Sequence, residues 1–134
     1  MTQLDFSPLL KAIARLQEGL DRYEQDRSDL QIRDGLIQRF EFTYEQCHKM
    51  LKRYLKRASA SPEVFDTMPF QDLIRSACAQ GLLLGDWTQW KTHREMRAKS
   101  SYTHDEPVAC EVVQAIPGFL REARYLSDQL QARS

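Results

Sequence analysis

Apolar residues recur along most of the chain at spacings of three and four, the pattern of amphipathic helices. The first such run follows Ser7-Pro8, where a hydroxyl residue ahead of a proline predicts a helix N-cap at Ser7. Its apolar positions are Leu9, Leu10, Ile13, Leu16, Leu20 and Tyr23. A charged stretch over residues 21–29 ends the run, so we expect a turn there.

A longer helix is predicted from about Gln31 to Arg57. One side of it carries the apolar stripe Leu36, Phe40, Tyr44, Cys47, Leu51 and Leu55. The opposite side carries the cations Lys49, Lys52, Arg53, Lys56 and Arg57. The simpler interpretation of these cations is a solvated face, and the alternative is a surface that binds phosphates.

The middle of the chain contains a loop and a shorter helix. Residues 58–69 have little periodicity and two prolines, which predicts a loop with a short turn at Pro62–Phe65. A third helix is expected over Phe70–Gln80, and Gly81 suits the left-handed cap that ends many helices. The inward positions of this helix are Leu73, Ile74, Ala77 and Cys78.

Two aspartates mark the starts of the remaining helices. Asp86 caps a helix from Trp87 to about Lys99, with Trp87, Trp90 and Met96 on its buried side. A polar break over residues 100–104 follows, and Asp105 caps the last helix, which Pro117 is expected to kink. The apolar stripe of that helix is Val108, Val112, Ile116, Phe119, Leu120, Ala123, Leu126 and Leu130.

These elements predict an all-α fold, an antiparallel up-down bundle of about five helices around a four-helix core. The length of 134 residues fits a single domain over residues 1–134. Apolar residues make up 42% of the chain, which is enough for a hydrophobic core and unlike a disordered protein. The 19 basic and 19 acidic residues cancel, which argues against a uniformly basic nucleic-acid-binding protein.

Targeting signals and metal motifs are weak or missing in the sequence. Residues 1–7 lack the basic and apolar segments of a secretory leader, and no apolar run reaches membrane-spanning length. The three cysteines are widely spaced, so we expect a reduced, cytoplasmic protein without membrane contact. Glu45 and His48 have the ExxH spacing of di-iron helical bundles, but the second such pair is missing, and no metal or cofactor is expected.

The segment from Arg94 to Glu106 concentrates cations, hydroxyls, a tyrosine and a histidine between two predicted helices. Arg97 can hold a phosphate with two hydrogen bonds, and His104 can take or give a proton near neutral pH. An arginine with a histidine suffices to cleave RNA without a metal. The alternative is a capping loop in which Arg97 forms a surface ion pair with Asp105 or Glu106.

Several ordered stretches resemble a known family, the HEPN-domain nucleotidyltransferase substrate-binding proteins, also called HepT toxins. The resemblance covers nearly the whole chain, from Leu16 to Leu130. The most specific stretches are residues 39–45 (RFEFTYE), 49–55 (KMLKRYL), Ile74-Arg75-Ser76-Ala77 through Gly81-Leu82, Trp90 leading into Arg97, and 100–106 (SSYTHDE).

The resemblance implies a HEPN-like helical bundle that forms a homodimer, acts as a toxin of a toxin–antitoxin module, and pairs with a minimal nucleotidyltransferase (MNT). It implies Arg97 and His104 as catalytic residues of a metal-independent ribonuclease, and Tyr102 as the acceptor of AMP from the partner. Further candidates for contacts with RNA phosphates are Arg94, Lys99, Ser100, Ser101, Lys52 and Arg53.

The sequence departs from the common family motif at three positions. Ala98 replaces an asparagine, and the tyrosine and histidine have exchanged places as Tyr102 and His104. Two hypotheses follow. The first is a dimeric toxin that cleaves RNA and is neutralised by AMP transfer. The second is a non-catalytic subunit that binds the nucleotidyltransferase and presents substrate to it.

Overall fold

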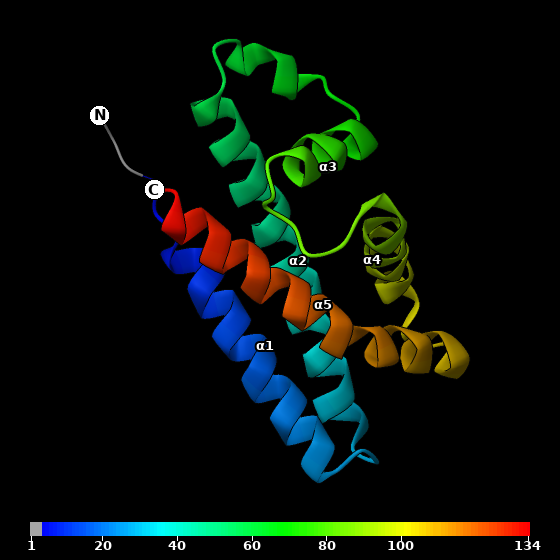
Figure 1. The fold of residues 1–134 in the computed structure, drawn as a ribbon. Coiled ribbons are helices and arrows are strands. Elements are labelled where there is room, and N and C mark those ends of the chain that lie inside the picture. Colours follow the sequence, from blue (N-terminus) through cyan, green and yellow to red (C-terminus); the bar gives the residue numbers. More distant parts are fainter. Residues whose placement is uncertain (1–3) are drawn as a thin grey trace.

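The computed structural model describes residues 4–134, and within them it consists of helices joined by short connections (Figure 1). Residues 1–3, part of the segment expected to lack a secretory leader, lie outside the described residues. Five α-helices and two short 3₁₀ helices follow in the order α1 (Ser7–Gln25), α2 (Leu30–Ala58), η1 (Pro62–Asp66), α3 (Phe70–Ala79), α4 (Trp87–Lys99), η2 (Ser100–Tyr102) and α5 (Glu106–Ala132). The predicted all-α class is confirmed.

The three long helices pack against one another and carry the shorter ones. α1 and α2 form an antiparallel pair, and α5 crosses both of them (Figure 1). α4 packs against α5 and α2, and α3 fills the space between α2 and α4. The chain therefore brings the end of α4 and the start of α5 beside α2, where the candidate site lies.

The predicted apolar stripes form one continuous core. Its centre is aromatic, with Phe40 of α2 and Phe119 of α5 in edge-to-face contact at 5.1 Å between ring centroids, and Trp90 of α4 beside them. Such pairs add to the stability that burial alone provides. Leu10 is the exception, because it flanks the buried stripe of α1 and is 40% exposed.

Two predicted aspartate caps are confirmed, and one predicted cap is wrong. Asp86 and Asp105 accept hydrogen bonds from the free amides of α4 and α5, with a complete capping box at Asp86. Ser7 is not the N-cap of α1. The cap position is Phe6, and the Ser7 amide donates to the Asp5 carboxylate at 2.9 Å. The Asp5 carboxylate, and not the Ser7 hydroxyl, therefore accepts a hydrogen bond from an amide at the start of α1.

Gly81 ends α3 as predicted, with a φ of +73°. The Leu82 amide donates to the Ala77 carbonyl and the Gly81 amide to that of Cys78, both at 3.0 Å, which is the Schellman arrangement. At the other end of the chain, α5 continues through Pro117 as one helix whose axis changes direction in its orange part (Figure 1). Among the described residues, no helix is both long and apolar enough to cross a membrane.

Candidate ribonuclease site

Arg97 lies near the end of α4, and its guanidinium reaches two carboxylates of α2. Its Nη1 donates to Glu41 Oε2 at 3.0 Å, and its Nη2 donates to Glu45 Oε1 at 2.5 Å. Glu41 and Glu45 are four residues apart on α2, so they share one side of the helix. The guanidinium is thus held in one orientation while 28% of the Arg97 side chain stays exposed.

Ser100 joins this network from the first residue of η2. Its Oγ lies 3.0 Å from Glu41 Oε2 and 2.5 Å from the Arg97 carbonyl oxygen, either of which can accept its proton. Ser100 is buried, so its hydroxyl ties the end of α4 to α2 and does not face solvent. Ser101, the next candidate for a phosphate contact, is exposed.

Tyr102 is the last residue of η2, His104 lies in the short connection from η2 to α5, and both are exposed. Their ring centroids are 6.4 Å apart, and 59% of Tyr102 is accessible. The Asp105 amide donates to the Tyr102 carbonyl at 3.1 Å, which closes a turn around His104. The segment therefore presents a phenol and an imidazole to solvent from one tight turn.

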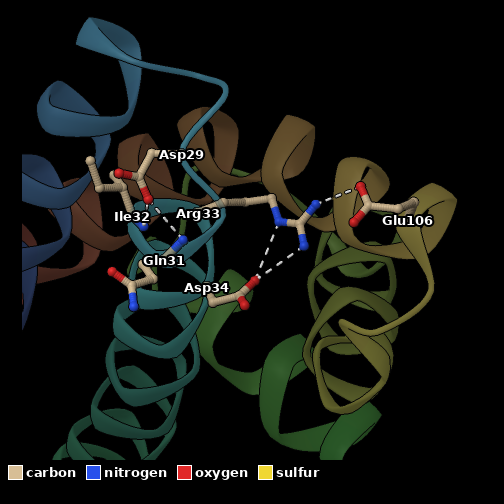
Figure 2. A network of polar contacts seen from close by, with 6 residues as sticks. All are labelled: Asp29, Gln31, Ile32, Arg33, Asp34 and Glu106. Carbon is tan, nitrogen blue, oxygen red and sulfur yellow. Dashed lines mark hydrogen bonds and ion pairs between the residues drawn. The ribbon is translucent and has the colours of Figure 1, made fainter.

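Arg33 connects the start of α2 to the start of α5, as Figure 2 shows. Its Nη1 donates to Glu106 Oε2 at 2.7 Å, and its Nε and Nη2 donate to Asp34 Oδ1 at 3.3 Å. Glu106 therefore pairs with Arg33. The alternative in which Arg97 pairs with Asp105 or Glu106 is wrong, because the nearer carboxylates belong to α2.

The other basic candidates lie outside the hydrogen-bond network of Arg97. The Arg94 guanidinium lies 5.2 Å above the centre of the Phe70 ring, and Lys99 Nζ pairs with Glu111 at 2.6 Å. Lys52 is half-buried on α2, whereas Arg53 is exposed and lines a shallow groove at the end of that helix. The cations thus spread from the motif along the C-terminal half of α2.

His48 of α2 and Arg94 of α4 pack against the same aromatic side chain. The His48 ring lies edge-on to Phe70 at 5.1 Å between centroids, and the Arg94 guanidinium lies over the Phe70 ring. Burial lowers the pKa of His48, and the charges of Lys52 and Arg94 lower it further. The side of α4 that carries Arg94 therefore adjoins α2 at His48.

The ExxH pair is not arranged as a metal site. Glu45 binds Arg97 and His48 packs on Phe70. Within residues 4–134, no three His, Cys, Asp or Glu residues lie together in a way that could hold a metal ion.

Two buried charged residues were missed by the sequence interpretation. Arg33 is 5% exposed, and Glu122 is 2% exposed and accepts hydrogen bonds from the amides of Leu84 and Gly85 and from Trp90 Nε1. Both fall on the apolar stripes of their helices, Arg33 one turn before Ile37 and Glu122 three residues after Phe119. A charged residue on an apolar stripe is the signal that could have identified each.

Comparison with known proteins places this geometry in a family. Residues 4–132 match the family described as nucleotidyltransferase substrate binding protein like. The chain is 38% identical to a probable ribonuclease HepT of Haemophilus influenzae over 100 residues, which is 75% of this chain and 68% of that protein.

A solved structure, that of HI0074 from Haemophilus influenzae, has the same fold. It was described as the fold of a substrate binding domain of a nucleotidyltransferase, and it superposes with a TM-score of 0.87 at 31% identity. The match covers 95% of this chain and 99% of that one. The protein therefore belongs to the nucleotidyltransferase substrate-binding family.

Proposed function

We propose that this protein is a metal-independent endoribonuclease of the HepT kind, the toxin of a module in which a nucleotidyltransferase neutralises it. The observation that carries the proposal is the guanidinium of Arg97, held by Glu41 and Glu45, with an exposed His104 seven residues later in a tight turn. The probable ribonuclease HepT, 38% identical, supports the same activity.

The proposed reaction is attack by a ribose 2′-hydroxyl on the adjacent phosphorus. His104 accepts the 2′-hydroxyl proton, the new O–P bond forms, and the bond from phosphorus to the 5′-oxygen breaks, leaving a 2′,3′-cyclic phosphate. The departing 5′-oxygen takes a proton from an imidazolium or from water. Arg97 stabilises the added negative charge on the phosphorane by hydrogen bonds that strengthen as the charge develops.

The same proposal includes a homodimer. A two-fold axis beside the α4–α5 junction duplicates Arg97 and His104, so one imidazole can act as base while the other acts as acid. Sedimentation of the purified protein tests this part. A mass of two chains at micromolar concentration is expected, and a monomer at high concentration contradicts the dimer.

Cleavage is tested with purified protein, a transfer RNA or a messenger RNA, and EDTA in the buffer. We expect Arg97→Ala and His104→Ala each to lower the cleavage rate about 100-fold or more. Arg121→Ala, which removes an exposed cation from α5, is the matched control and keeps the wild-type rate. Intact RNA with the wild-type protein, together with normal growth on expression, contradicts the proposal.

A nucleotidyltransferase partner is the second part of the proposal. It is supported by the family match and by the HI0074 structure, which was described as a substrate binding domain of such an enzyme. Tyr102 is the proposed acceptor because 59% of it is exposed beside His104. Its phenolic oxygen gives its proton to a base of the nucleotidyltransferase or to water and attacks the α-phosphorus of ATP. The new O–P bond forms as the bond from the α-phosphorus to the bridging oxygen breaks, and pyrophosphate leaves with that electron pair.

The non-catalytic alternative keeps this partner and drops the ribonuclease. Incubation with the nucleotidyltransferase partner and ATP is expected to add one or more AMP groups to the protein. Intact-mass measurement detects the added mass. Tyr102→Phe abolishes that addition, whereas Tyr125→Phe, a half-buried tyrosine on α5, does not. A stable complex with an unmodified protein and intact RNA favours the non-catalytic subunit.

A further inference from the structure

Arg33 is a buried arginine far in sequence from the motif. It is 5% exposed, and its guanidinium contacts Glu106 and Asp34, which are 62% and 53% exposed. A buried guanidinium is costly unless carboxylates face it, so its position is tied to those two groups. Asp34 is the next residue on the same helix, whereas Glu106 is the first residue of α5 (Figure 2). The contact with Glu106 is therefore the one that joins two elements.

Glu106 and the turn that carries His104 form one hydrogen-bonded unit. The Asp105 amide bonds the Tyr102 carbonyl, and the Val108 amide bonds the Asp105 side chain at 3.3 Å. The Ala109 amide bonds the Asp105 carbonyl at 2.9 Å. Because these bonds run without a break from Tyr102 into α5, an anchor on Glu106 also fixes the position of His104.

α2 holds the motif at both ends. Glu41 binds Arg97 and Ser100 at the end of α4, and Arg33 binds Glu106 at the start of α5. These two residues are eight positions apart on one helix, a rise of about 12 Å. A rigid helix thus spans the gap between the guanidinium side and the imidazole side of the motif.

We infer that Arg33 is a positioning residue, which through Glu106 fixes the position of His104 relative to Arg97. The inference rests on the proposed ribonuclease, and it adds a residue that touches neither phosphate nor the reacting atoms. Catalysis by a held base depends on its distance from the proton it takes, so a loosened turn lowers kcat and leaves phosphate binding intact.

Steady-state cleavage of one RNA separates this role from a general effect on stability. Glu106→Ala is expected to lower kcat about 10- to 100-fold with KM within about twofold. Glu106→Gln keeps an oxygen that accepts from Arg33, and most of the rate is retained. Glu24→Ala removes an exposed carboxylate that pairs with Arg27 at the end of α1, away from the motif, and kcat is unchanged. Equal losses in Glu106→Ala and Glu24→Ala, or a wild-type kcat in Glu106→Ala, overturn the inference.

Hydrogen exchange provides a readout that does not require cleavage. In Glu106→Ala and in Arg33→Lys, amides of residues 100–109 are expected to exchange faster, while those of α1 stay as in the wild type. Unchanged exchange over residues 100–109 also overturns the inference. If the wild-type protein cleaves no RNA, the proposed function fails, and the exchange data still decide whether Arg33 fixes the turn.

Discussion

At the scale of single residues, the two carboxylates on Arg97 differ in burial and therefore in role. The Glu41 side chain is 27% exposed and also contacts Ser100, whereas that of Glu45 is 58% exposed and bonds only Nη2 among the contacts described. A phosphate that approaches from solvent competes with the more exposed carboxylate. In the proposed ribonuclease, Glu41 thus orients the guanidinium, and Glu45 occupies the edge that an RNA phosphate would take.

Glu45→Gln is accordingly expected to tighten RNA binding about threefold, because a neutral amide competes less with phosphate for the guanidinium. Glu41→Gln is expected to lower kcat, because the guanidinium loses the half-buried charge that orients it. Fluorescence anisotropy with a 2′-O-methyl RNA, which cannot be cleaved, measures the first effect. Weaker binding by Glu45→Gln contradicts the division of roles.

His93 predicts a pH dependence of stability. It packs on Trp90 and Phe119, with ring centroids 5.2 and 5.3 Å away, and burial lowers its pKa to about 4. The unfolded chain binds a proton near pH 6.5, so the free energy of unfolding falls as pH drops from 6.5 to 4, by about 3 kcal/mol.

Urea unfolding at several pH values tests this prediction. His93→Phe keeps an aromatic ring but removes the titration, so the difference in unfolding free energy between wild type and variant grows below pH 6.5. A difference that stays constant from pH 7 to pH 4 would contradict the prediction, because it would mean that His93 has the same pKa in the folded and the unfolded chain.

At the scale of elements, most helix ends and apolar stripes were predictable because they depend on residues close in sequence, although the cap predicted at Ser7 is wrong. Asp86, Asp105 and Gly81 each act on backbone groups within a few positions, and those predictions are confirmed. The partners of Arg97 were not predictable in this way. Glu41 lies 56 residues earlier, and its closeness to Arg97 arises only when α4 packs against α2. The candidate residues could be named from sequence, but their contacts could not.

Two glycines give opposite predictions for the same substitution. Gly81 has a φ of +73° and ends α3, so Gly81→Ala is expected to lower the unfolding free energy by about 1 kcal/mol. Gly35 lies inside α2, where an added Cβ has no heavy atom within 4 Å apart from its chain neighbours and the backbone of its own helix. Gly35→Ala is therefore expected to raise the unfolding free energy by about 0.5–1 kcal/mol. Chemical denaturation of both variants measures the pair. Stabilisation by both substitutions would mean that residue 81 can leave the left-handed backbone conformation without a loss of stability.

At the scale of the whole molecule, a net charge of zero hides an uneven distribution. The C-terminal half of α2 carries Lys49, Lys52, Arg53, Lys56 and Arg57, and a groove of about 520 Å³ at its end is lined in part by three of these cations. Lys56 pairs with Asp66 at 2.6 Å. Lys49 and Arg53 are exposed. The distribution favours an anionic strand that leaves the motif and runs along α2.

Such a strand releases counterions when it binds, so the salt dependence of RNA affinity reports how many of its phosphates contact cations of the protein. Lys49→Gln and Arg53→Gln are each expected to reduce the slope of log K against log salt by about 0.7, the value for single strands, with kcat unchanged. Lys11→Gln, which removes an exposed cation from α1, keeps the wild-type slope. If the slope is unchanged but the nucleotidyltransferase no longer co-purifies, the basic face of α2 binds the protein partner and RNA reaches the motif from another side.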